Sequence, residues 1–132
     1  MTQEDKDLLL KDLCARLPYG VILSVTLKDK YDEIVTRDIQ LSDGNLTYIT
    51  RPSHWREYKP YLRPMSSMTE EEKIEYGDRC YFTLDCISGN QQYYFNELYD
   101  WLNAHHFDFM GLIPKNLAIE VTESNNPYEN NN

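Results

Sequence analysis

The fold is decided by a run of alternating residues, VILSVTL at positions 21–27. Apolar side chains occupy every second position of this run, and Ser24 and Thr26 stand between them. Successive side chains of a β-strand point to opposite faces, so a period of two predicts a strand with one buried face. The triplet Lys28-Asp29-Lys30 that follows predicts a turn.

Two more strands are expected after this turn. Residues 34–41 carry four apolar positions and predict the second strand, and residues 46–49 predict the third. Between them, Ser-Asp-Gly-Asn at 42–45 favours a tight hairpin, because Asp-Gly accepts positive φ angles. The predicted result is a three-stranded antiparallel meander, either open or curled into a small, partly open barrel.

An amphipathic helix is predicted before the strands, over residues 3–17. Its apolar stripe recurs at i, i+3, i+4 and i+7 and is formed by Leu10, Leu13, Cys14 and Leu17, widened by Leu9. Thr2 is a suitable N-cap, and Pro18 followed by Gly20 ends the helix.

The middle of the chain is rich in proline. Three prolines within residues 51–66 remove backbone donors and restrict φ, so an extended crossing segment is expected there rather than a strand or helix. A capping box then opens a short helix, formed either by Thr69 with Glu72 or by Ser67 with Glu70. This helix is expected to end at Gly77, and the acidic residues 70–72 suit its first turn.

The C-terminal half completes an α+β fold. A strand is predicted over 80–87, a turn at 88–90, a second long helix over 92–106 and a short final strand over 117–121. These elements are expected to form a single α+β domain spanning 1–123. The Asn-rich tail at 124–132 has almost nothing to bury and is expected to be disordered.

Composition narrows the classes of function. The net charge of −9 over 132 residues disfavours wholesale binding to nucleic acid or anionic lipid. The N-terminus is acidic, unlike a secretory signal, and the apolar runs are too short to cross a bilayer. The chain has three cysteines and no CxxC motif, and the three are Cys14, Cys80 and Cys86. This pattern predicts free, largely buried thiols and a cytoplasmic location.

The polar residues His105, His106 and Asp108 form the most chemistry-like cluster. Adjacent helical residues point about 100° apart, so the two imidazoles do not easily converge on one metal ion. The favoured interpretation is that His105 packs on the apolar face and His106 lies near the last carbonyls of the helix. Asp108 is expected to bond to its own downstream backbone around Gly111. Use of these groups as a general base or metal site is the less favoured alternative.

A basic and aromatic segment at 51–63 is the predicted binding surface. The candidate residues are Arg51, Trp55, Arg56, Tyr58, Lys59, Tyr61 and Arg63. Rings interleaved with arginine are typical of a stacking platform for single-stranded nucleic acid. The commoner role of such residues is structural, in which the rings fasten a proline-rich crossover to the sheet while the cations neutralise nearby carboxylates.

Three segments resemble a family of short uncharacterised proteins found in gut Bacteroides genomes, often near prophage genes. They are LLLKDLCARLPYG at 8–20, KPYLRPMSSMTEEE at 59–72 and the segment from Asp100 to Leu117 with its DWLNAHHFD motif. This chain departs from the family pattern at Met110, where arginine is usual, and in its Asn-rich tail. The resemblance implies a prophage association and assigns no catalytic residue.

The leading functional hypothesis is a non-enzymatic interaction protein that uses an aromatic-rich surface, in keeping with its eleven tyrosines. The partner is expected to be a macromolecule, protein rather than nucleic acid, with no membrane, metal or cofactor, and a homodimer is left open. The alternative is nucleic-acid handling, either by single-strand binding through residues 51–63 or by acidic inhibition of a DNA-binding enzyme. A hydrolase or metal site at His105, His106 and Asp108 ranks last.

Overall fold

The computed structural model of this chain describes residues 2–49, 56–85 and 91–129. The fold is α+β, as predicted, with helices beside a four-stranded mixed sheet. In chain order the elements are α1 (Gln3–Arg16), η1 (Leu17–Tyr19), β1 (Ile22–Lys28), β2 (Ile34–Gln40), α2 (Asp43–Ile49), β3 (Arg56–Leu62), η2 (Met65–Ser67), α3 (Glu70–Asp85), α4 (Gln91–Ala104) and β4 (Ile119–Glu120).

The sheet has the strand order β2-β1-β3-β4. β1 is antiparallel to both β2 and β3, and the short β4 is parallel to β3. The strands predicted over 21–27 and 34–41 are therefore confirmed, and β4 lies within the final strand predicted over 117–121. The outer strands do not pair with each other, so the sheet is open and the barrel alternative is wrong.

The third predicted strand, over 46–49, is wrong because this segment is helix α2. Ser42 starts the helix: its Oγ accepts a hydrogen bond from Asn45 N at 3.3 Å, and its carbonyl accepts one from Leu46 N at 2.9 Å. Leu46 and Ile49 are three residues apart, which places both on one helical face, and both pack on the core. The Asp-Gly pair therefore lies in the first turn of a helix instead of in a hairpin.

The expectation of an extended crossing segment between 51 and 66 is also wrong for its second half. Residues 56–62 form β3, which pairs with β1 in the middle of the sheet. Pro60 lies opposite Leu23, whereas β4 begins to pair only at Tyr61. Among the described residues, Pro60 thus has a strand neighbour on one side only, and a missing N–H is tolerated where one side of a strand is unpaired.

The main core lies between α1, α2 and one face of the sheet. Leu9 and Leu13 of α1 pack against Val21 and Leu23, and the same cluster includes Leu62 of β3. The predicted N-cap Thr2 is confirmed: Thr2 Oγ1 accepts a hydrogen bond from Asp5 N at 3.0 Å, and the Asp5 side chain completes a capping box.

The predicted burial of the cysteines is not what the structure shows. Cys14 is exposed and Cys80 is half-buried, both with free thiols, while Cys86 lies outside the described residues. The buried face of α1 runs through Leu9, Asp12, Leu13 and Arg16, not through Cys14. Two charged residues at helical spacing thus occupy core positions.

A second core lies between α3 and α4. The helix expected to end at Gly77 continues to Asp85, so the strand predicted over 80–87 is wrong for residues 80–85. The Thr69 and Glu72 capping box is confirmed, with reciprocal bonds of 2.9 and 3.1 Å. Packing overrides the low helix propensity of glycine. Tyr76 and Cys80 of α3 pack against a buried cluster from α4, the loop after it and the residue two positions before α3, namely Met68, Leu98, Trp101, Leu102 and Phe107.

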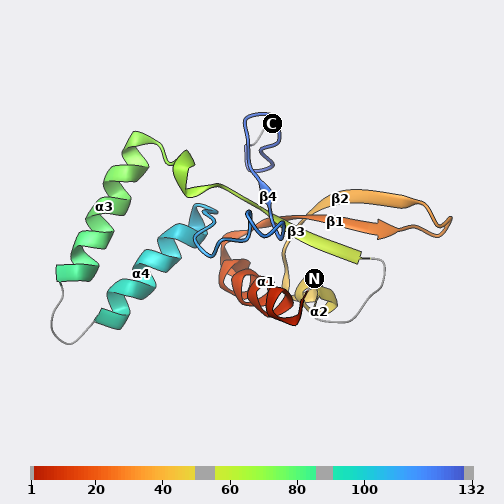
Figure 1. Cartoon of the computed structure of the whole chain (residues 1–132), viewed down its shortest axis with the longest axis horizontal. Helices are drawn as coiled ribbons and strands as arrows, with labels where there is room; N and C mark the ends of the chain where they lie inside the picture. The colour runs from red at the N-terminus through yellow and green to blue at the C-terminus, as the bar shows by residue number, and fades with distance from the viewer. Residues whose placement is uncertain (1, 50–55, 86–90, 130–132) are drawn as a thin grey trace.

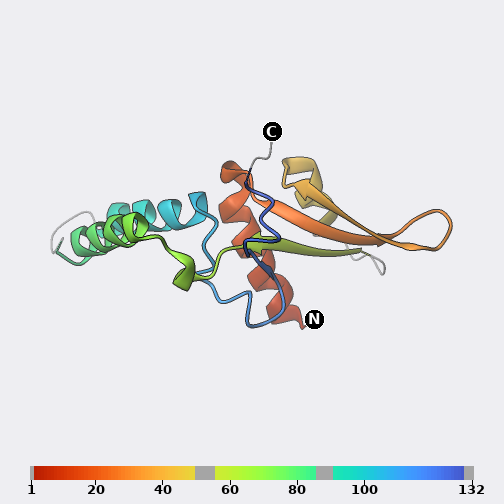
Figure 2. The same ribbon diagram turned by 90° about the horizontal axis from the view of Figure 1, so that it is seen from above.

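The second long helix, predicted over 92–106, is observed as α4. The α3–α4 pair lies at one end of the molecule, and the β1–β2 hairpin projects at the other end (Figure 1). The view from above shows the same separation (Figure 2). Within the described ranges, no helix combines the length and apolar character needed to cross a bilayer.

Candidate functional site

The end of α4 positions both histidines. His106 has a left-handed backbone with φ of 63°, the conformation that most often requires glycine. Its N–H donates to Asn103 O at 3.1 Å, and the N–H of Phe107 donates to Leu102 O at 3.0 Å. These two bonds form a Schellman cap, which satisfies carbonyls that the helix end leaves open. The cap turns the chain sharply between His105 and Phe107.

The two imidazoles consequently contact different parts of the molecule. The ring of His105 lies 4.4 Å from that of Trp101, and its Nδ1 is 2.9 Å from Trp101 O. A carbonyl oxygen can only accept, so Nδ1 of His105 carries the proton. The ring of His106 stacks instead on Tyr128, with centroids 3.7 Å apart. Among the residues that the structure describes, no group of three or more His, Cys, Asp or Glu side chains is placed to hold a metal ion.

Asp108 shapes the turn after α4. Its carboxylate is buried and accepts hydrogen bonds from Leu112 N at 2.8 Å and Ile113 N at 2.9 Å. Gly111 has φ of 79°, as the sequence suggested for this turn. Both carboxylate oxygens are thus engaged with the backbone, so Asp108 does not orient either imidazole.

A buried ion pair lies beside this turn. Arg16 is 0% exposed and Asp12 is 2% exposed. Nε of Arg16 donates to Asp12 Oδ2 at 2.7 Å, and Nη2 donates to Phe107 O at 2.6 Å. Burial raises the pKa of Asp12, while the hydrogen bond from Arg16 opposes this rise. Arg16 therefore ties helix α1 to the loop that follows α4.

Tyr128 closes the same region from the C-terminal tail. Its hydroxyl accepts from Ile22 N at 2.9 Å and donates to Tyr61 O at 2.7 Å. Leu23 and Pro60 form the last paired rung of β1 and β3, so Ile22 and Tyr61 hold the next positions along the ladder. The hydroxyl bridges the two strands where direct pairing stops. The expectation that the tail has almost nothing to bury is wrong for this residue.

Burial controls the protonation of both stacked rings. It raises the pKa of Tyr128 further above neutral pH. It also lowers the pKa of His106 to about 4, helped by the positive charge of Arg16. The imidazole of His106 is consequently neutral at pH 7. A neutral ring stacked on a neutral phenol suits a packing role.

Several polar atoms in this region lack a hydrogen-bond partner in the described part of the chain. All are buried side-chain atoms: Asp12 Oδ1, Arg16 Nη1, Asn103 Oδ1 and His106 Nδ1. Such atoms mark a polar interior. Arg16 and Asp12 are enclosed by the core, however, which does not suit contact with an external substrate.

The predicted binding segment at 51–63 is divided by its strand. Arg51 and Trp55 lie outside the described residues, and for Arg56 only the backbone, at the start of β3, is described. Tyr58 lies opposite Val25 and packs on the main core. Tyr61, three residues later, lies on the other face, where its hydroxyl donates to Asp38 at 2.9 Å. Tyr58 and Tyr61 therefore do not form one continuous stacking platform.

Lys59 of this segment is engaged with an acidic and an amide group. Nζ of Lys59 is 3.0 Å from Glu57 Oε1 and donates to Asn116 Oδ1 at 3.2 Å. Such contacts match the interpretation in which the cations neutralise nearby carboxylates.

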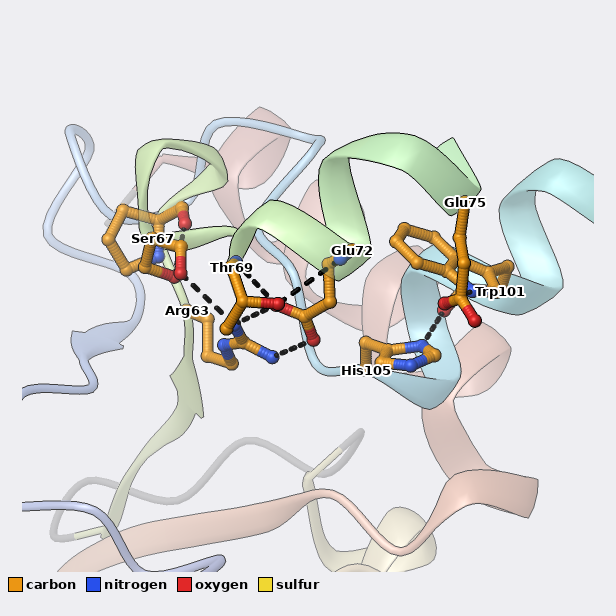
Figure 3. Close-up of polar contacts among 8 residues, drawn as sticks. Arg63, Ser67, Thr69, Glu72, Glu75, Trp101 and His105 are labelled. Carbon is orange, nitrogen blue, oxygen red and sulfur yellow. Dashed lines mark hydrogen bonds and ion pairs between the residues drawn. The ribbon is translucent and has the colours of Figure 1, made fainter. Parts of the chain in front are cut away.

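Arg63 has the most specific contacts of the predicted binding residues. Its Nη1 and Nη2 donate to the two carboxylate oxygens of Glu72 at 2.8 and 2.6 Å, and Nη2 also donates to Ser67 O at 3.2 Å (Figure 3). The guanidinium lies over the ring of Phe107 at 4.2 Å. Its hydrogen bonds lower the pKa of Glu72 to about 2. Arg63 therefore joins β3 to α3.

The exposed apolar residues of the sheet lie on the β1–β2 hairpin. Tyr31 in the connecting turn and Ile34 at the start of β2 are each 71% exposed. The turn itself is ordered by Asp29, whose Oδ1 accepts from Tyr31 N and Glu33 N at 2.9 Å. The hairpin thus presents large apolar side chains on a fixed backbone. The exposure of these two residues could not be predicted from the sequence, because tyrosine and isoleucine are common in and beside strands.

The sequence did hold a signal for the buried ion pair. Asp12 and Arg16 are spaced i, i+4 beside Leu9 and Leu13, so a helical wheel places all four on one face. No comparable local signal exists for Tyr128, because its partner Ile22 is 106 residues away.

The fold class and these contacts define an α+β protein with an open mixed sheet and an enclosed polar centre. Comparisons with protein-family models, curated proteins and solved structures found no match to this chain.

Proposed function

We propose that this chain is a non-catalytic, prophage-associated protein that binds another protein in the cytoplasm through the end of its β1–β2 hairpin. The observation that carries the proposal is the exposure of Tyr31 and Ile34, 71% each, on a turn ordered by Asp29. Large apolar side chains on a preorganised backbone suit protein recognition, because little conformational freedom is lost on binding. The prophage association rests on the resemblance of the three segments described above.

The residues that looked suited to chemistry support the non-catalytic part of the proposal. His105 is bonded to the backbone of Trp101, and Asp108 is bonded to the backbone of the turn after it. His106 is stacked on Tyr128 and neutral. Each of these groups has a structural role that accounts for its presence.

Protein is favoured over nucleic acid as the partner. The chain has a net charge of −9, which repels phosphate. The cations of Lys59 and Arg63 are paired with carboxylates, and Tyr58 faces the core. A gel-shift titration of single-stranded DNA at low salt checks this choice. Binding that weakens steeply with added salt would favour the nucleic-acid alternative.

Photo-crosslinking tests the proposed surface. The photoreactive residue p-benzoylphenylalanine is placed at Tyr31 in one variant and at Ile74 of α3 in a control, because Ile74 is 66% exposed on another element. In lysate of a prophage-bearing Bacteroides host, position 31 is expected to give a discrete protein adduct that position 74 does not give.

Competition makes this experiment specific to the hairpin. Excess wild-type chain is expected to abolish the adduct, whereas excess chain carrying Tyr31→Ser and Ile34→Ser is expected to leave it. Both substitutions are at exposed positions, so the fold should be retained. The same adducts at positions 31 and 74, or equal competition by both chains, would count against the proposal.

A further inference from the structure

Strand β2 forms an edge of the sheet along the same hairpin. In the part of the chain that the structure describes, β2 pairs with β1 on one side and has no strand on the other. It is seven residues long. An edge of this length presents backbone donors and acceptors to another strand, and proteins often protect such edges with charges. The charges on β2 are arranged in a specific way.

Residues 33–37, Glu-Ile-Val-Thr-Arg, are complementary to themselves when two copies run antiparallel. With Val35 opposite Val35 of a second copy, Ile34 lies opposite Thr36 and Glu33 lies opposite Arg37. Two-fold symmetry repeats each pair, so the register contains two Glu33 to Arg37 pairs. The three central pairs consist of β-branched residues, which are favoured in strands.

We propose that two copies of this chain pair through residues 33–37, which are Glu33 and the first four residues of β2, and join their sheets into one continuous sheet. The segment is accessible for this: Ile34 is 71% exposed, and Glu33, Thr36 and Arg37 are also exposed. The inference shares the hairpin with the proposed function and goes beyond it by naming a second copy as the occupant of the edge. Tyr31 remains outside the paired segment.

Alternative registers are less favourable on charge. A two-fold axis at Arg37 places the two Arg37 side chains opposite each other, and an axis at Asp38 does the same for Asp38. An axis at Thr36 places Val35 opposite Arg37 and Ile34 opposite Asp38. Like charges directly opposite each other are destabilising, whereas opposite charges and β-branched pairs stabilise the ladder. Of these four registers, the one centred on Val35 is therefore preferred.

The ends of the proposed ladder are also compatible with pairing. The next rung would bring Asp32 towards Asp38 of the second copy. Asp32 has φ of 64° and lies outside the strand, and its carboxylate is 3.3 Å from Lys28 Nζ. Glu33, by contrast, is held in place because its N–H donates to Asp29 Oδ1 and its carbonyl accepts from Asp29 N. The ladder therefore ends at Glu33 without a facing pair of carboxylates.

A five-residue ladder covers less surface than an obligate dimer interface, so the dimer is expected to be weak and to form only as the protein concentration rises. Sedimentation velocity across a concentration series at low salt is the direct measurement. Wild-type chain is expected to shift reversibly from monomer to dimer. A chain that stays monomeric at every concentration overturns the inference.

Charge reversal identifies the register. Glu33→Arg and Arg37→Glu each convert two attractive pairs into two repulsive ones, and each is expected to weaken self-association about tenfold or more. The double variant Glu33→Arg with Arg37→Glu restores complementary pairs and is expected to recover association to within a few fold. Equal association of wild type and both single variants would exclude this register.

Mixing the two single variants is the sharpest test. In the mixed dimer, arginines at 33 and 37 of one chain face glutamates at 37 and 33 of the other. Two chains that are each monomeric should therefore form a heterodimer, and failure to do so counts against the inference. Circular dichroism checks that all variants are folded. Loss of dimerisation would leave both Tyr31 and Ile34 free for the partner protein, so the Tyr31 crosslink would persist in a chain that does not dimerise, and the two proposals fail separately.

Discussion

The ring of His106 lies on the ring of Tyr128, with centroids 3.7 Å apart and ring planes within 9° of parallel. His106 belongs to the cap of α4, and Tyr128 belongs to the C-terminal tail. The stack places the phenol hydroxyl between Ile22 of β1 and Tyr61 of β3. One side chain of the tail thus connects the helical end of the molecule to the sheet.

Removal of this hydroxyl is expected to destabilise the protein. Tyr128→Phe keeps the stack but leaves Ile22 N–H and Tyr61 C=O without their bridge, at a cost of about 1–3 kcal/mol. Tyr128→Ala also loses the stack and should cost more. Urea unfolding followed by circular dichroism gives these values, with Glu129→Ala at an exposed position as the control. If Tyr128→Phe and Glu129→Ala were equally stable, the hydroxyl bridge would contribute nothing measurable to the free energy of unfolding.

The stability of the fold should fall in mild acid because of His106. Its pKa is 6.5 in the unfolded chain and about 4 in the folded protein. Between these values the unfolded chain binds more protons, so the free energy of unfolding decreases as pH falls from about 6.5 to about 4. The ring is partly exposed, so the loss is expected to be about 1–2 kcal/mol.

His106→Asn isolates this effect, because asparagine accepts the left-handed backbone and does not titrate. Urea unfolding at a series of pH values should show a flatter profile above pH 4 for the variant. Glu72, whose pKa falls from 4.5 to about 2, stabilises the fold above 4.5 and loses this contribution as pH drops towards 2, a separate window. Identical profiles for both proteins between 6.5 and 4 would show that His106 is not the source.

The parts of the fold that sequence could predict are those with local signals. The Thr69 and Glu72 capping box and the turn from Asp108 to Gly111 each involve residues within five positions of one another, and both are formed. Strand β1 was predictable because its period of two holds from Leu23 to Leu27. In these cases the chain nearby supplies the contacts that stabilise the structure.

The parts that sequence could not predict depend on distant contacts or on ambiguous spacing. Leu46 and Ile49 suit either a short strand or one helical face, and packing on the core selects the helix. Pro60 is compatible with β3 because one side of the strand lacks a neighbour at that position. The site of Tyr128 requires the meeting of β1, β3 and the tail, which no local pattern encodes.

The buried pair of Asp12 and Arg16 gives a third prediction. Arg16→Met leaves the carboxyl group of Asp12 enclosed without its partner and removes the bond to Phe107 O, so a loss of about 3–5 kcal/mol is expected. The double variant Asp12→Leu with Arg16→Met replaces the pair by apolar side chains and should recover most of this loss. Chemical denaturation of the three proteins measures the difference. Equal losses in the single and double variants would mean that the pair is not coupled.

Two glycines should respond in opposite directions to the same substitution. Gly77 lies inside α3, and a Cβ there meets nothing within 4 Å, so Gly77→Ala is expected to stabilise the protein by about 0.5–1 kcal/mol. Gly111 also has open space around it, but its φ of 79° is unfavourable for alanine. Gly111→Ala is therefore expected to cost about 1–2 kcal/mol, because backbone conformation and not a steric contact opposes it. Thermal and urea unfolding of both variants compare the two effects directly. If Gly77→Ala were destabilised, α3 would not continue through this position. If the stability of Gly111→Ala were unchanged, the turn after Asp108 would adopt another conformation.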